Sequence, residues 1–249
     1  MRALILSDIH ANLEALDAVL DASAGAYEEL WNLGDTVGYG GSPNEAVDKM
    51  RALAAINVRG NHDRVCCGLT SGAGFNPVAR AAARWTEETL TTKNLAWLKS
   101  MEVGPVERGG AACAHGSPLD EDDYILNVRD AWEPLRKAVK PLTFFGHTHV
   151  QGVFALEGTK WHEGRPKFSS KKGAVSWTLP LDAGMRYLIN PGSVGQPRDH
   201  DWRAAYALYD AEKAEVTFHR VPYDLAVAQG RIVMAGLPDR LALRLKEGR

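Results

Sequence analysis

Short apolar runs alternate with amphipathic segments through the first 60 residues of the chain. The runs Ala3 to Leu6, Glu29 to Leu33 and Ala54 to Val58 have the length expected of buried strands. Between them, apolar positions recur at helical spacing over Leu13 to Leu20 and over Asn44 to Leu53. This alternation predicts βαβ units and a largely parallel sheet.

The pattern changes character after about residue 150. Before that point, residues 76–101 and Asp130 to Val139 are predicted to be helical, and Ala111 to Ala114 and Leu142 to Phe145 to be strands. Beyond it we expect five strands joined by turns: Val153 to Leu156, Ala174 to Leu179, Arg186 to Ile189, Ala204 to Tyr209 and Val216 to Val221. These strands predict a second sheet packed on the first. The tail from Asp224 is predicted to be mostly helical, with a break near residues 236–238.

The segment Glu157 to Gly173 lacks periodicity and is rich in Lys and Arg. A solvated hairpin loop is the first interpretation. The alternative is a basic flap that draws anionic substrates toward a cleft.

The composition is that of an ordinary globular protein, and we expect one domain over residues 1–249. Hydrophobic residues make up 45% of the chain and charged residues 24%. The 29 Lys and Arg nearly balance the 31 Asp and Glu, for a net charge of -2. That balance disfavours a dedicated nucleic-acid-binding protein.

Neither membrane insertion nor an oxidising compartment is indicated. No apolar stretch approaches the roughly 20 residues that cross a bilayer, and the N-terminal apolar run is too short for the core of a signal peptide. The cysteines Cys66, Cys67 and Cys113 are odd in number and lack CxxC spacing. Neither a disulfide framework nor a thiolate zinc site is therefore predicted, and a cytoplasmic location fits best.

Five short polar motifs each follow an apolar run. In chain order they are Asp8-Ile9-His10, Gly34-Asp35, Gly60-Asn61-His62-Asp63, His115-Gly116 and Gly146-His147-Thr148-His149. In open α/β sheets, ligands bind in the loops beyond the carboxyl ends of the strands. We therefore expect these distant motifs to converge on one edge of the fold.

Together the motifs supply enough donors to hold two divalent cations side by side. The candidate ligands are two Asp, one Asn and four His: Asp8, His10, Asp35, Asn61, His115, His147 and His149. Mixed nitrogen and oxygen ligation without thiolate suits Mn, our first choice, or Fe, Zn, Co or Ni, better than calcium. Two metals about 3.5–4 Å apart can generate hydroxide and clamp a phosphoryl group, so the motifs predict a dinuclear phosphoester hydrolase.

Other classes fit the motifs less well. A dinuclear amidohydrolase begins with His-x-His, where this chain has Asp8-Ile9-His10, and a metallo-β-lactamase-like enzyme needs a His-x-His-x-Asp-His motif that the chain lacks. A scaffold or sensor protein that keeps its metals for structure remains an alternative.

The series of motifs resembles the calcineurin-like metallophosphoesterase superfamily, whose blocks run D-x-H, G-D, G-N-H-[D/E], H and G-H-x-H. The segments 37–40, 42–45 and 190–198 resemble its small prokaryotic branch, often described as phosphodiesterases or relatives of diadenosine tetraphosphatase. The resemblance implies a mixed α/β fold, an αββα sandwich of two mixed sheets flanked by helices. It also implies a dinuclear metal site at the carboxyl ends of the strands.

Carried over position by position, the resemblance assigns a role to each motif residue. It implies one metal held by Asp8, His10, Asp35 and His149, and a second held by Asp35, Asn61, His115 and His147. His62 would not be a ligand but a general acid toward the leaving group, or a donor to a phosphoryl oxygen. Asp63 would either orient His62 or cap the helix that follows.

The chain departs from the branch of eukaryotic-type Ser/Thr protein phosphatases. Those enzymes carry Asp and Arg shortly after the G-D aspartate, where this chain has Val37-Gly38-Tyr39-Gly40. We therefore expect a small phosphorylated substrate, such as a nucleotide or a dinucleoside polyphosphate, with a phosphoprotein as the alternative. Asn12 and Arg198 are candidate phosphate contacts, although capping of a helix is the competing role for Asn12.

Overall fold

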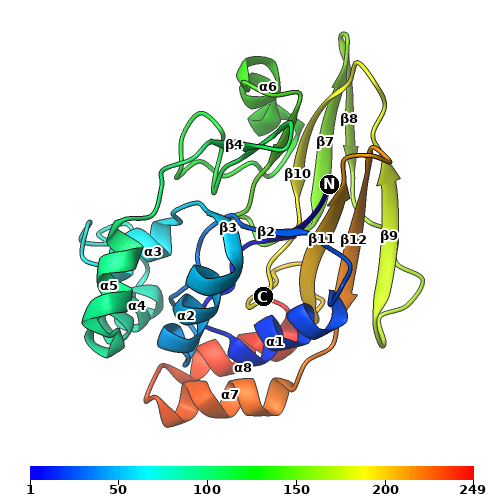
Figure 1. The fold of residues 1–249 in the computed structure, drawn as a ribbon. Helices are drawn as coiled ribbons and strands as arrows, with labels where there is room; N and C mark the ends of the chain where they lie inside the picture. The colour runs from blue at the N-terminus through cyan, green and yellow to red at the C-terminus, as the bar shows by residue number, and fades with distance from the viewer.

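Two six-stranded sheets pack against each other, with helices outside them (Figure 1). The computed structural model describes residues 1–249. The first sheet has the order β3 (Ala54–Asn57), β2 (Glu29–Asn32), β1 (Arg2–Leu6), β11 (Ala204–Asp210), β12 (Glu215–Val221) and β9 (Val175–Pro180). The second has the order β4 (Val106–Arg108), β5 (Ala111–Cys113), β6 (Leu142–Phe144), β10 (Arg186–Asn190), β7 (Gly152–Glu157) and β8 (Lys160–Gly164).

Both sheets are mixed. Strand β1 is parallel to β2 and antiparallel to β11, and β10 is parallel to β6 and antiparallel to β7. The outer face of the first sheet is covered by α1 (Leu13–Ala22), α2 (Pro43–Leu53), α7 (Leu225–Met234) and α8 (Asp239–Glu247). Helix α6 (Val128–Lys137) covers the second sheet. The predicted αββα sandwich is thus confirmed.

Strand β1 shows why the sequences of the N-terminal strands are continuously apolar and do not alternate with polar residues. Ala3 and Ile5 belong to the cluster of buried side chains between the two sheets, whereas Leu4 and Leu6 pack under the helices. Successive side chains point to opposite faces of a strand, and here both faces are buried.

The remaining helices form a group beside β3, at the left of Figure 1. They are α3 (Asn61–Cys66), α4 (Pro77–Thr89) and α5 (Thr92–Lys99). The single helical stretch predicted over residues 76–101 is therefore wrong in one respect. It is interrupted at Leu90 and Thr91, and the Thr91 hydroxyl accepts a hydrogen bond from the backbone N–H of Asn94 to begin α5.

The assignment of strands to sheets also needs correction. The late strands β9, β11 and β12 join the N-terminal strands, while β7 and β10 join β5 and β6. Strands β4 and β8 were not predicted. Strand β8 pairs with β7, so part of the basic segment is an ordered hairpin. Its Arg165, Lys167 and Lys171 line a separate cavity, which none of the predicted site residues lines, and the proposed role of this segment as a basic flap stays a prediction.

None of the helices has the length and apolar character that spanning a membrane requires.

A partly buried histidine in the first sheet, His219, is expected to make the fold less stable in acid. The ring of His219 stacks on Tyr206, its cross-strand neighbour, with centroids 4.6 Å apart, and its Nε2 is buried without a hydrogen-bond partner. Burial lowers the pKa of His219 to about 4. Protonation therefore favours the unfolded chain, where the pKa is ordinary, and stability is lost as the pH falls from about 6.5 toward 4.

We expect His219→Phe to lessen this acid sensitivity. At pH 5 the histidine should lower the free energy of unfolding by about 2 kcal/mol, and at pH 7.5 it should contribute almost nothing. Urea unfolding of both metal-free proteins at the two pH values measures the difference. Parallel loss of stability in the two proteins would contradict the prediction.

Candidate metal centre

The predicted ligands converge where the two sheets meet. Asp8 follows β1 of the first sheet, and His147 follows β6 of the second. The backbone N–H of His147 lies 3.2 Å from each carboxylate oxygen of Asp8. In the same way, His115 Nδ1 lies 3.0 Å from the carbonyl oxygen of Leu33, which follows β2. These contacts join loops from both sheets into one site.

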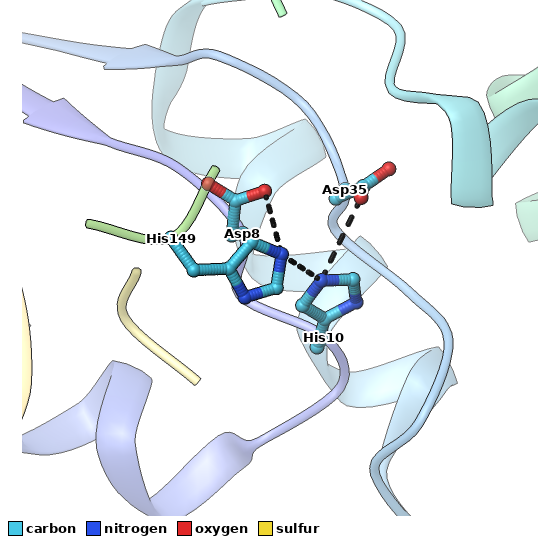
Figure 2. Close-up of side chains that lie close together, drawn as sticks. All are labelled: Asp8, His10, Asp35 and His149. Atoms are coloured by element: carbon cyan, nitrogen blue, oxygen red, sulfur yellow. Dashed lines mark hydrogen bonds and ion pairs between the residues drawn. The ribbon is translucent and has the colours of Figure 1, made fainter. Parts of the chain in front are cut away.

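One group of donors consists of Asp8, His10, Asp35 and His149, and Figure 2 shows their side chains facing one another. His149 Nε2 lies 3.3 Å from Asp8 Oδ1 and 3.2 Å from His10 Nε2. His10 Nε2 in turn lies 3.6 Å from Asp35 Oδ2. Atoms that share a cation through bonds of about 2.0–2.2 Å are separated by similar distances. All four residues are buried.

A second group adjoins the first through Asp35. Asp35 Oδ2 lies 3.5 Å from His115 Nε2, which is 3.1 Å from His147 Nδ1 and 3.2 Å from Asn61 Oδ1. Asp35 Oδ2 is buried and accepts no hydrogen bond. An uncompensated carboxylate oxygen between two sets of nitrogen donors is the arrangement expected of a bridging ligand. The structure thus brings all seven predicted ligands into two adjoining groups.

Backbone strain is concentrated at these residues. Five of the seven have a left-handed backbone, with φ of 53° at Asp8, 49° at His10, 54° at Asp35, 65° at His147 and 61° at His149. This conformation costs a residue other than glycine about 1–2 kcal/mol. Strain that clusters in this way is typical of functional sites, where the geometry of side chains matters more than local stability.

Two glycines allow the groups to approach closely. A Cβ atom on Gly60 would lie 2.1 Å from Asp35 Oδ1, and one on Gly146 would lie 1.9 Å from Ser7 Oγ and 3.0 Å from Asp8 Oδ2. Any side chain at either position would displace a carboxylate. The glycines of the G-N-H and G-H-x-H motifs are therefore required by the packing of the site.

Backbone carbonyls orient three of the imidazole rings. His10 Nδ1 faces the carbonyl oxygen of Val37 at 3.1 Å, and His149 Nδ1 faces that of Gln196 at 2.6 Å, as His115 does with Leu33. Because a carbonyl oxygen can only accept, the proton sits on Nδ1 in each ring. When the ring is neutral, the Nε2 lone pair then points into the site, as a metal ligand requires.

The electrostatics of the groups suit cation binding. Burial lowers the pKa of His10 and of His149 well below the usual range and that of His147 to about 3, so these rings are neutral at pH 7. Burial opposes ionisation of Asp35, but the neighbouring histidines, His115 foremost, together hold its pKa well below the ordinary value. Burial also lowers the pKa of His115, but the carboxylates of Asp35, Asp8 and Asp63 together outweigh it and raise that pKa to about 9. A cation would therefore displace a proton from His115.

His62 lies beside the two groups. Its backbone N–H donates to Asp35 Oδ1 at 2.8 Å, and its ring lies between Tyr39 and Phe75, with centroids 4.4 Å from each. Its Nδ1 is buried without a partner, and burial lowers the pKa of His62 to about 4. The ring is consequently neutral at pH 7 and has one N–H to donate.

Asp63 and Asn12 have capping roles, which corrects two predicted site residues. Asp63 Oδ2 accepts from the backbone N–H of Gly60 and Oδ1 from that of Val37, and neither oxygen contacts His62. Asn12 Oδ1 accepts from the N–H of Ala15 to begin α1, and its amide group donates to a carbonyl oxygen. Both side chains are therefore occupied by the backbone, as the capping alternative predicts.

A cavity of about 720 Å³ opens beside the metal centre. It is lined by His62, Asn61, His147 and the predicted phosphate contact Arg198. Sequence reasoning missed other residues of its wall: Tyr39, Phe75, Tyr124 and Arg244. Tyr39 belongs to the segment 37–40, which resembles the small prokaryotic branch of the superfamily. No local signal distinguishes the others from ordinary surface residues.

Comparison with known proteins agrees with this geometry. The chain is 35% identical to the Methanocaldococcus jannaschii protein MJ0912, over 98% of this chain and 97% of that protein. The crystal structure of a metallophosphoesterase from Sphaerobacter thermophilus is similar with a TM-score of 0.86 and 41% identity, covering 100% of this chain and 99% of that one. The hypothetical protein PH1004 from Pyrococcus horikoshii OT3 shares the fold, with a TM-score of 0.75, 21% identity, and coverage of 100% and 98%.

The profile of the calcineurin-like phosphoesterase superfamily domain matches residues 1–214, which include all five motifs and both groups of donors. The match spans most of the chain. The protein therefore belongs to the calcineurin-like phosphoesterase superfamily and is a phosphoester hydrolase.

Proposed function

We propose that the protein hydrolyses a phosphoester bond in a small phosphorylated molecule by means of two divalent cations that share Asp35. One cation would be held by Asp8, His10, Asp35 and His149, and the other by Asp35, Asn61, His115 and His147. The observation that carries the proposal is the buried Asp35 Oδ2, which accepts no hydrogen bond and lies 3.6 and 3.5 Å from nitrogens of the two groups.

The residues around the groups have distinct roles in this proposal. When bound, a pair of divalent cations lowers the pKa of water and neutralises the phosphoryl oxygens. His62 stands on the cavity side, where it donates a proton toward the leaving oxygen. Its low pKa in the free protein is raised by an anionic phosphoryl group that binds beside it. Arg198 contributes positive charge from the cavity wall.

The dimensions of the cavity favour a small substrate. A volume of about 720 Å³ lies within the range of about 300–1,000 Å³ typical of sites for small molecules. With a net charge of -2, the chain has no overall excess of positive charge that would favour nucleic acid as its main partner. We propose manganese as the native metal, and a reducing compartment such as the cytoplasm, with which the three buried free thiols are consistent.

Activity should depend on metal. We expect metal-free protein to release no p-nitrophenol from p-nitrophenyl phosphate or its bis ester, and Mn²⁺ to restore release because both groups of donors are then occupied. The assay is run from neutral to alkaline pH, with Mg²⁺ and Ca²⁺ as comparison ions. If neither ester is cleaved at any pH with any metal, the protein is a metal-binding scaffold and the proposal is wrong.

A further inference from the structure

Three arginines line the cavity, and they differ in how their charge is balanced. Arg64 pairs with Glu121 and, through two hydrogen bonds of 2.8 and 2.7 Å, with Asp122. Neither Arg198 nor Arg244 pairs with an Asp or Glu side chain, and both face the same space; Arg244 Nε donates to the main-chain oxygen of Arg249 at 2.6 Å.

Arg198 is fixed at the edge of the metal centre. Its backbone N–H donates to the carbonyl oxygen of His149 at 3.2 Å, which ties it to a predicted ligand. Its guanidinium has one weak contact, 3.4 Å from Gln196 Oε1, and its Nε is buried without a partner. A buried guanidinium nitrogen without an acceptor is unfavourable, and an anion in the cavity would supply that acceptor.

Arg244 reaches the same cavity from α8. Its guanidinium lies 5.5 Å from the centroid of the Tyr39 ring, and that ring packs 4.4 Å from His62 and 4.7 Å from His10. The ring of Tyr39 therefore lies between Arg244 and the two histidines His10 and His62. Burial lowers the pKa of Arg244, and the like charge of Arg198 lowers it further. No Asp or Glu side chain pairs with either guanidinium group to offset this repulsion.

We propose that Arg198 and Arg244 together bind a second phosphate group of the substrate, next to the one that is cleaved. The substrate class is then a small molecule with at least two linked phosphates. A phosphate oxygen accepts from guanidinium groups and removes the repulsion between them. This inference rests on the proposed function. The family match ends at residue 214, so Arg244 would be a specificity residue supplied by a part of the chain beyond it.

The test compares ligands with one and two phosphates. Mn-loaded protein is titrated calorimetrically with AMP and with adenosine 5′-(α,β-methylene)diphosphate, whose bridging carbon resists cleavage. We expect the diphosphate to bind the original protein at least about tenfold more tightly. Arg244→Gln should reduce that preference by about tenfold to a hundredfold, as expected for a lost charge-assisted hydrogen bond. Arg244→Lys should restore part of it.

Arg240→Gln is the matched control, because Arg240 is an exposed arginine on the same helix that does not line the cavity. It should keep the preference for the diphosphate. An unchanged preference in Arg244→Gln, or an equal loss in Arg240→Gln, overturns the phosphate subsite. These outcomes differ from failure of the proposed function, in which the original protein shows no metal-dependent cleavage of p-nitrophenyl phosphate. Thermal unfolding of each variant confirms that it is folded.

Discussion

Asp35→Asn should remove both cations and at least about a thousandfold of the activity. Asp35 is the residue common to both groups, with Oδ2 between His10 and His115. Asparagine keeps the size of the side chain and an oxygen that can accept from the N–H of His62. It lacks the negative charge and the second oxygen that a bridge requires. Metal content per chain, measured by plasma emission after gel filtration, should fall from two to less than one.

The control is Asp17→Asn, which removes a carboxylate of α1 that pairs with Lys49 at 2.9 Å, away from the site. It should leave metal content and turnover as they are. Equal thermal stability of the two metal-free variants would show that Asp35→Asn has not unfolded the protein. An Asp35→Asn protein that retained two cations would contradict the bridging role.

His62→Ala should lower kcat by about 10²–10⁴-fold while the protein keeps its metals. The ring lies beside the two groups without joining either, and its Nδ1 is free of partners. A general acid matters most when the leaving oxygen is basic. The loss should therefore be larger for an alkyl phosphate than for p-nitrophenyl phosphate, whose leaving group needs little protonation.

His162→Ala is a suitable comparison, since His162 lies half exposed on β8 and belongs neither to the donor groups nor to the cavity wall. It should not change kcat for either ester. Loss of metal in His62→Ala would make His62 a ligand. A loss of the same size for both leaving groups would instead assign it a contact with a phosphoryl oxygen.

The positions of the candidate ligands were predictable because each motif that supplies them follows a strand that the sequence pattern reveals. Asp8, Asp35 and His115 each follow a short apolar run, and the carboxyl ends of such strands supply the binding loops of α/β sheets. No single motif is specific, but their order predicted a shared site, and the resemblance to the calcineurin-like superfamily implied how the residues divide into two groups. The structure brings all seven side chains into two adjoining groups.

The pairing of strands was not predictable from the same pattern. Alternation shows that β11 and β12 have a buried face but does not show which strand lies beside them. Strand β11 pairs with β1 across almost the whole chain, Arg2 opposite Asp210. Such a partnership depends on tertiary packing rather than on local propensity.

Side chains with two competing roles were equally ambiguous. The side chains of Asp63 and Asn12 could serve either in catalysis or as a helix cap. Only their hydrogen bonds with backbone N–H groups in the structure show that they cap. Arg240 and Arg244 lie one turn apart on α8 and look alike in the sequence. Only the folded structure places Arg244 in the cavity wall and leaves Arg240 in solvent.

The most direct measurement is an anomalous-scattering map from crystals of the protein grown with Mn²⁺. The account predicts two peaks about 3.5–4 Å apart, with Asp35 between them. One peak would lie among Asp8, His10 and His149, and the other among Asn61, His115 and His147. A single peak, or two peaks that do not share Asp35, would contradict it.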